Sequence, residues 1–235
     1  MARYSKPSIT LTDFIRQSAW GRALRPADLD AVIGSAYEGR FQPGESIVRC
    51  GDFAASWVGL IDGLVVQQVV GRDGKLAALT SAFSGVWFGE GTLMREGRWQ
   101  YDAVARRETR AAFIPRDTFM ALLGSDLSFS GFIAHLLNDR LSHYMGLLAN
   151  ERLTGAEVRL ARVLASLFDP HLYPARPALL RISQGEVALL AGMSRQRANA
   201  ALKLLEAAGL VALERGGLRV LDLGGLGSYG GALRA

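Results

Sequence analysis

The fold of this chain is decided by Ser183-Gln-Gly-Glu-Val-Ala-Leu-Leu-Ala-Gly192, Met193-Ser-Arg-Gln-Arg-Ala-Asn-Ala-Ala-Leu-Lys-Leu-Leu-Glu206 and, after a short gap, Val211-Ala-Leu-Glu-Arg-Gly-Gly-Leu-Arg-Val-Leu221. The first two pieces predict two short helices around a glycine turn, and the third predicts a β-hairpin. This order of elements is that of a winged helix-turn-helix, which places its second helix in the major groove of DNA.

Start and stop signals delimit each of these elements. Ser183 followed by Glu186 is a capping box, so the first helix begins there. Gly192 predicts the turn, and Ser194 is an N-cap candidate for the second helix. Gly209 fits the residue just after a helix end, where a left-handed backbone is common.

The predicted second helix separates an apolar face from a polar one. Its small and aliphatic residues Ala198, Ala201, Leu202 and Leu205 recur at helical spacing and should face the core. The predicted DNA-contacting residues are Ser183, Ser194, Arg195, Gln196, Arg197, Asn199, Lys203 and the wing residue Arg215. Arg suits guanine edges and Gln suits adenine edges, so Arg195 and Gln196 in the first turn are the candidates for base readout. The alternative is a helical hairpin with a solvated basic face.

The excess of positive charge lies with this segment. The chain has 27 Lys and Arg against 22 Asp and Glu, a net charge of +5. Residues 150–235 hold 11 basic and 7 acidic residues, so they carry +4 of that excess. A basic domain attracts polyanions such as DNA through counterion release.

Length and composition indicate a two-domain globular protein. The chain has 235 residues, of which 49% are hydrophobic and 21% charged. No apolar run approaches the roughly 18 residues that span a bilayer, and the first residues lack the apolar region of a signal peptide. We therefore expect a cytoplasmic protein with no membrane partner. Cys50 is the single cysteine, which excludes an internal disulfide framework.

The N-terminal half changes from helical to β-rich texture. Residues 11–38 predict helix, with Pro26 in a first helical turn. Short β-rich runs follow at Ser46–Val48, Trp57–Ile61, Leu64–Val70, Leu76–Phe83, Ala103–Arg106 and Ala111–Ile114. Gly-containing turns separate them, as in a sandwich or barrel. Residues 117–123 and 126–152 return to helix.

The long helix carries an apolar stripe. Its members are Phe129, Ile133, Leu137, Leu141, Tyr144 and Leu148, spaced by three or four residues. Such a stripe predicts a dimer seam of the coiled-coil kind, and the alternative is packing against its own domain. Thr154 with Glu157 predicts a capping box for the next helix, and Asp169 to Pro177 predicts a loop. The predicted domains are therefore residues 1–125, the dimerisation helix 126–152, and the winged helix-turn-helix domain 153–235 with a flexible C-terminal tail.

At this point the order of parts resembles the Crp–Fnr family of bacterial transcription regulators. The resemblance covers about residues 20–222. It rests on Pro43-Gly44-Glu45, Gly51-Asp52, Asp62-Gly63, Trp87-Phe88-Gly89-Glu90 and Gly97, and on Arg159-Leu-Ala-Arg162, Ile182-Ser183, Glu186, Gly192, Ser194-Arg195 and Leu202-Lys-Leu-Leu-Glu206. It implies an α+β fold with a cyclic-nucleotide-binding-like β-roll, a homodimer that binds double-stranded DNA, RNA polymerase as a further partner, and an effector in the roll.

The resemblance also indicates where the effector pocket would lie and where this chain departs from the family. The pocket residues it implies are Gly89, Glu90, Gln100, Tyr101 and Tyr144. Members that bind cyclic nucleotides carry an Arg-Ser/Thr-Ala triplet, whose Arg neutralises the phosphate. Here Gln100-Tyr101-Asp102 aligns with that triplet, and losing a charge-assisted contact to a buried phosphate costs on the order of 2–3 kcal/mol. We therefore expect an effector other than cyclic AMP. Alternatively, Gly89-Glu90 is only a turn.

Other chemistries find little support in the residues. One cysteine cannot hold an iron–sulfur cluster, and the three histidines offer no axial haem ligand from the roll. Gly225-Leu-Gly-Ser-Tyr-Gly230 matches a dinucleotide-binding pattern, but too few residues follow it to form the required helix and strand. We expect no enzyme activity, no metal and no cofactor. Two alternatives stay open: a regulator that needs no ligand, and a ligand-binding regulatory subunit of an enzyme.

Overall fold

The computed structural model describes residues 9–153, 155–170, 172–173 and 179–231. The chain divides into two compact units. The first contains residues up to Gln67 together with Ala82–His135, and the second contains Gln68–Ser81 together with the residues from Leu136 onward. Helix α5 (Leu127–Leu153) contributes to both units.

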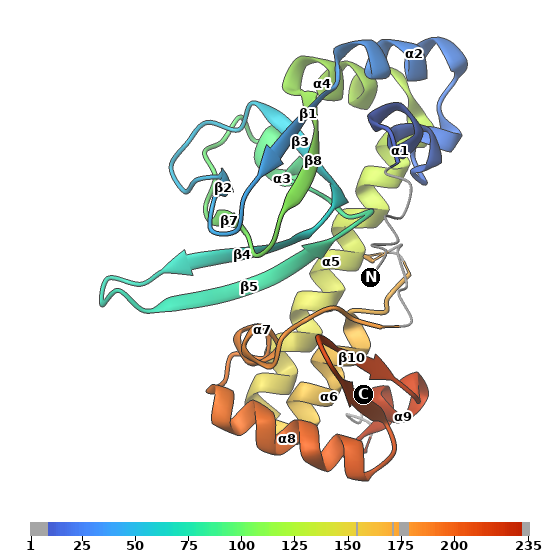
Figure 1. Ribbon diagram of the computed structural model, residues 1–235. Helices are drawn as coiled ribbons and strands as arrows, with labels where there is room; N and C mark the ends of the chain where they lie inside the picture. Colours follow the sequence, from blue (N-terminus) through green and yellow to red (C-terminus); the bar gives the residue numbers. More distant parts are fainter. Residues whose placement is uncertain (1–8, 154, 171, 174–178, 232–235) are drawn as a thin grey trace, which may run out of the picture. The chain divides into compact units, whose positions relative to one another are not determined.

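The first unit is built on antiparallel strands, with α1, α2 and α4 together at one end and α3 beside the strands (Figure 1). Its helices are α1 (Leu11–Gln17), the 3-10 turn η1 (Gly21–Ala23), α2 (Pro26–Ser35), α3 (Glu90–Met94) and α4 (Arg116–Ser125). The strands are β1 (Tyr37–Phe41), β2 (Ser46–Val48), β3 (Ser56–Asp62), β4 (Leu64–Val70), β5 (Leu76–Phe83), β6 (Trp87–Phe88), β7 (Asp102–Ala105) and β8 (Thr109–Pro115). They form two four-stranded sheets, in the orders β1-β8-β3-β6 and β2-β7-β4-β5. The chain is therefore α+β, as the sequence predicted.

An aromatic cluster forms the core of the first unit. Trp57 of β3 lies 4.6 Å from Trp87 and 5.7 Å from Phe129, measured between ring centroids. Trp20 packs on the same group, with its ring 5.1 Å from that of Trp87. A Cβ at Gly59 would lie 2.7 Å from the Trp87 ring, so the bare backbone of β3 leaves room for that indole. Buried aromatic rings in tilted and edge-to-face contact stabilise a core beyond their area alone.

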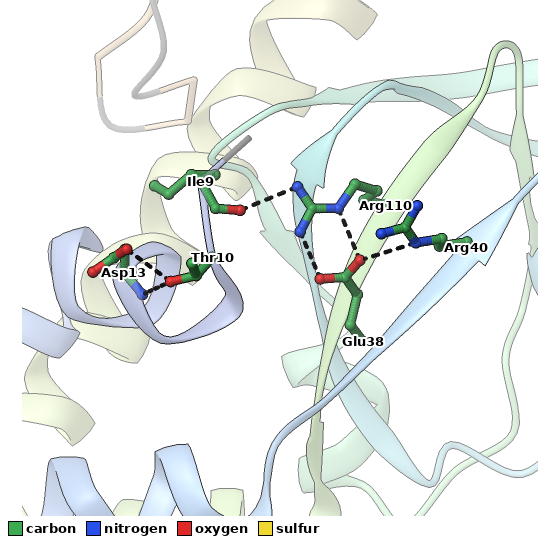
Figure 2. A network of polar contacts seen from close by, with 6 residues as sticks. All are labelled: Ile9, Thr10, Asp13, Glu38, Arg40 and Arg110. Carbon is green, nitrogen blue, oxygen red and sulfur yellow. Dashed lines mark hydrogen bonds and ion pairs between the residues drawn. The ribbon is translucent and has the colours of Figure 1, made fainter. Parts of the chain in front are cut away.

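A polar network ties the N-terminal segment to the sheet (Figure 2). Arg110 of β8 donates to Glu38 of β1 from Nε at 2.8 Å and from Nη2 at 2.7 Å, and its Nη1 donates to the carbonyl oxygen of Ile9 at 3.1 Å. The hydrogen bonds from Arg110 hold the pKa of the Glu38 carboxyl below its usual value. Thr10 caps α1 by accepting from the backbone N–H of Asp13 at 3.0 Å. Through the Ile9 carbonyl, the start of α1 is thereby linked to Arg110 of β8, which lies 101 positions later in the sequence.

The second unit contains the helices that the sequence singled out (Figure 1). It comprises α6 (Ala156–Ser166), α7 (Gln184–Leu190), α8 (Arg195–Ala207), β9 (Val211–Glu214), β10 (Gly217–Val220) and α9 (Leu223–Ser228). Leu160 and Leu164 of α6 are buried with Leu202 and Leu205 of α8, which gives the unit its own core. Residues Gln68–Ser81 of the β4–β5 hairpin, the end of β4 and most of β5, belong to this unit, and Thr80 of β5 hydrogen-bonds the hydroxyl of Tyr173 at 3.2 Å. Burial raises the pKa of Tyr173 to about 12.

Several predicted elements are confirmed and others need correction. The strands Ser46–Val48, Leu64–Val70 and Leu76–Phe83 have the predicted bounds. The helical region predicted over residues 11–38 ends at Ser35, because β1 begins at Tyr37. Strands β1 and β6 and helix α3 were not predicted.

The C-terminal tail is also corrected. Residues 223–228 form α9 instead of a flexible tail, because Asp222 caps the helix and Leu226 is fully buried. Helix α6 has Gly155 as its N-cap, which has no side chain and so forms no side-chain capping bond. The predicted cap Thr154 lies outside the described residues.

Candidate nucleic-acid interface

The turn between α7 and α8 is fixed by local hydrogen bonds. Ser183 accepts from the backbone N–H of Glu186 at 3.2 Å, and the Glu186 carboxylate accepts from the N–H of Ser183 at 2.7 Å. The predicted capping box is therefore confirmed. Gly192 has a φ of +60°, and the next N–H, of Met193, donates back to the carbonyl of Ala188 at 3.0 Å. A left-handed residue closed by such a bond ends α7 and turns the chain toward α8.

Helix α8 begins at a capped N-terminus and ends at a glycine. Ser194 accepts from the backbone N–H of Arg197 at 3.3 Å, which confirms it as the N-cap. Gly209 follows the last helical residues with a φ of +73°, as predicted. The helix buries the four predicted core residues, Ala198, Ala201, Leu202 and Leu205. The side facing away from this core is available for a partner.

The polar residues of α8 lie around that outer side. Arg195, Gln196, Arg197 and Lys203 are exposed, whereas Asn199 is half-buried. At about 100° per residue, Gln196 and Lys203 lie opposite the buried row, and Arg195 and Arg197 lie on its two flanks. The Oδ1 atom of Asn199 is buried and has no hydrogen-bond partner in the described part of the chain. The structure thus brings together most of the residues that the sequence proposed for DNA.

The wing presents an exposed arginine at its turn, Arg215. Strands β9 and β10 pair in antiparallel register, with Glu214 opposite Gly217. Glu214 forms an ion pair with Arg219, and this hydrogen bond lowers the pKa of Glu214. Arg215 is exposed at the turn and forms no ion pair with the described residues. No described carboxylate therefore neutralises its charge.

Two of the predicted effector residues of the roll, Gly89 and Glu90, are buried. Glu90 is only 2% exposed, and its Oε2 atom accepts from the indole Nε1 of Trp57 at 3.3 Å. Gly89 has a φ of +101°, and a Cβ there would lie 2.3 Å from the Trp99 ring. Trp99 itself is 3% exposed. The glycine and the acid therefore face tryptophans of their own unit, and sequence reasoning missed both of these tryptophans.

The segment that aligns with the phosphate-binding triplet is occupied by internal contacts. Gln100 is exposed, and its amide donates to the carbonyl of Arg98 at 3.0 Å. Tyr101 packs edge-on against Trp99, with ring centroids 5.5 Å apart. Asp102 accepts from the backbone N–H of Cys50 at 2.8 Å. The remaining predicted pocket residue, Tyr144, belongs to the second unit and is 40% exposed.

The apolar stripe of α5 divides into buried and exposed members. Phe129 and Ile133 are each 1% exposed, which corrects their assignment to a dimer seam, because a residue enclosed by its own unit cannot reach a partner. Leu137 is half-buried. The later members Leu141, Tyr144 and Leu148 are 59%, 40% and 49% exposed.

The described residues offer neither a metal site nor a single membrane-spanning helix. Within the described ranges, no group of three or more His, Cys, Asp or Glu residues is arranged to hold a metal ion. No single helix among those residues is long and apolar enough to cross a membrane. Only α4 with Leu127–Ala149 reaches that length and hydropathy together, as a pair bent by 107°.

Comparison with known proteins gives matches over both units. The chain matches the family model of the cyclic nucleotide-binding domain over residues 38–126 and that of the Crp-like helix-turn-helix domain over residues 158–229. The cAMP-activated global transcriptional regulator Vfr of Pseudomonas aeruginosa is 28% identical over 192 residues, which cover 78% of this chain and 88% of that protein. The cyclic AMP receptor protein of Thermus thermophilus is 29% identical over 192 residues, covering 80% of this chain and 85% of that protein. The structure of FixK2 from Bradyrhizobium japonicum has the same fold, with a TM-score of 0.72 and 18% identity over 85% of this chain and 99% of that one.

Proposed function

The chain belongs to the Crp–Fnr family of DNA-binding transcription regulators, and from this premise we propose that it reads a specific DNA sequence as a homodimer through α8 and the β9–β10 wing. We further propose RNA polymerase as a partner of this regulator and the cytoplasm as its location. Two-fold symmetric dimers of this kind bind half-sites about 34 Å apart.

The observation that carries the proposal is the outer side of α8. Arg195 and Gln196 lie in its first turn, are exposed, and follow an N-cap that fixes where the helix begins. The first turn of a recognition helix is the part that meets base edges, where Arg suits guanine and Gln suits adenine. Arg197, Lys203 and Arg215 are placed for phosphates, which position a protein without specifying sequence.

For the roll, we propose an effector other than cyclic AMP. The two relatives named for cyclic AMP do not decide which effector this chain binds, because recognition depends on the residues at the pocket positions, here Gly89-Glu90 and Gln100-Tyr101-Asp102. The buried contact between Glu90 and Trp57, the cover of Gly89 by Trp99, and the uncharged Gln100 all support this proposal. Calorimetry with cyclic AMP is expected to give no binding heat at micromolar concentrations. A micromolar dissociation constant would overturn the proposal.

Two alternatives differ in what controls the protein. The activity of a regulator that needs no effector would be controlled by its concentration or by a protein partner. The internal contacts of Gly89-Glu90 and Gln100-Tyr101-Asp102 are compatible with such a regulator. A regulatory subunit of an enzyme would need no winged helix-turn-helix, so the exposed polar side of α8 counts against it.

The test of DNA reading is a binding-site selection on the wild type and on Arg195→Ala. Truncation of a guanine-reading arginine should cost about 1–3 kcal/mol and relax the preference at one base pair. Arg215→Ala is the matched control, since it should weaken all sequences alike and reduce the salt dependence. An unchanged base preference in Arg195→Ala would remove that residue from readout.

A further inference from the structure

The two strands of the wing are held at both of their outer edges. Leu213 of β9 lies opposite Leu218 of β10. The backbone of Leu218 points outward, because its N–H donates to the carbonyl of Leu180 at 2.9 Å and its carbonyl accepts from the Leu180 N–H at 2.8 Å. In an antiparallel ladder, both members of such a pair direct their backbone groups away from each other. The N–H of Leu213 therefore points away from β10, toward the open edge of β9.

A carboxylate from α8 occupies that open edge. Oε1 of Glu206 accepts from the N–H of Leu213 at 2.9 Å. The bond joins residues seven positions apart, one near the end of the recognition helix and one in the middle of a wing strand. Glu206 is exposed and forms no ion pair with the described residues, so the backbone amide is its observed polar contact.

The other backbone links between α8 and the wing lie at its base. The N–H of Leu210 donates to the carbonyl of Leu205 at 3.0 Å, and the carbonyl of Leu210 accepts from Leu221 at 2.9 Å and from Asp222 at 3.2 Å. A two-stranded hairpin is only marginally stable alone, and Leu180 holds only its β10 edge, so the links at the base leave the direction of β9 against α8 weakly fixed. Glu206 connects to the strand at Leu213, which is two residues before the tip residue Arg215.

We propose that Glu206 is a positioning residue for DNA binding: it sets the wing against α8 so that Arg215 meets a phosphate while the first turn of α8 meets the bases. This inference rests on the proposed DNA-binding function. It also makes a prediction opposite to simple electrostatics. Removing a carboxylate close to DNA should strengthen binding through charge alone, whereas loss of a positioning contact should weaken it.

The experiment measures affinity of the full-length protein for the DNA duplex selected by the wild type, at several salt concentrations. Glu206→Ala is expected to bind about three- to tenfold more weakly, the range of one lost hydrogen bond, and its salt slope should fall by about one, as in Arg215→Ala. Glu206→Gln is the matched control. Its amide oxygen can still accept from Leu213, so it should bind within about twofold of the wild type.

The double variant separates positioning from a merely structural role. If Glu206 acts through Arg215, then Glu206→Ala combined with Arg215→Ala should bind no more weakly than Arg215→Ala alone. Affinity of Glu206→Ala equal to or above that of the wild type would overturn the inference. The inference would also be overturned if the fold-losses of affinity from Glu206→Ala and Arg215→Ala multiplied in the double variant.

A measurement on the free protein keeps this inference apart from the DNA-binding proposal. Amide hydrogen exchange should show that Glu206→Ala removes protection at Leu213 and leaves it at Leu218, which is held by Leu180. An unprotected Leu213 in the wild type would overturn the inference with no DNA present. Failure of the wild type to select any duplex would instead refute the proposed function, while the exchange experiment still decides the link between Glu206 and the wing.

Discussion

The first half of α5 buries its apolar stripe, whereas the second half exposes it. Phe129 and Ile133 are each 1% exposed, while Leu141 and Leu148 are 59% and 49% exposed. The stripe continues through both halves at helical steps of three or four residues. Periodicity therefore identifies which side of a helix is apolar, but it does not say what covers that side.

Aromatic rings from other elements of the first unit cover the apolar side of the first half of α5. The Phe129 ring lies 5.8 Å from that of Trp20, 5.7 Å from Trp57 and 5.6 Å from Phe119. Two of these rings precede Phe129 by more than 70 positions in the sequence. The alternative reading of the stripe, packing against its own domain, thus holds for this half.

The largest expected effect in this comparison is on Phe129. Phe129→Ala should lower the free energy of unfolding by about 3–5 kcal/mol, because it leaves a cavity in the aromatic core. Denaturant titration followed by tryptophan fluorescence measures the change. Leu127→Ala is the matched control on the same half of the helix, since Leu127 is 91% exposed and its truncation should change stability by no more than about 0.5 kcal/mol. Equal small losses in both variants would contradict the burial of the first half.

The winged helix-turn-helix could be predicted in detail because its signals are local. Ser183 and Glu186 form reciprocal hydrogen bonds across three residues, and the Ser194 hydroxyl accepts from the backbone N–H of Arg197. Gly192 and Gly209 end their helices through backbone conformations that are accessible to glycine and strained for other residues. Such signals require only neighbours in the sequence, so a single chain reveals them.

The roll could be predicted as strands and turns, but its contacts could not. Glu90 was assigned to a pocket, yet its partner Trp57 stands 33 positions earlier. The cover of Gly89 by Trp99 depends on the path of the chain between them, which no local pattern describes. Long-range packing thus determines what surrounds Gly89 and Glu90, and a single sequence does not reveal it.

Helix α9 shows the same limit at the C-terminus. Leu223–Ser228 contains three glycines in six residues, a composition that disfavours helix. The helix forms because Asp222 caps it, with the N–H of Gly225 donating to its carboxylate at 2.8 Å, and because Leu226 is fully buried. Tertiary burial therefore overrides a weak intrinsic propensity here.

The second half of α5 gives the smaller effect on folding and tests the dimer proposal. Leu141→Asp should change the unfolding free energy of the single chain by only about 0.5 kcal/mol or less, because Leu141 already meets solvent. In a two-fold seam, however, each Asp would face an apolar surface and lose its hydration, which is unfavourable for an unpaired charge. Sedimentation equilibrium at micromolar concentration should therefore find a monomer. Binding to a duplex with two half-sites should weaken with it, since one monomer reaches only one of them. Ser142→Asp is the matched control: it adds the same charge at the next exposed position, off the stripe, and should remain a dimer. A Leu141→Asp protein with the mass of a dimer would show that the exposed half of the stripe has another occupant.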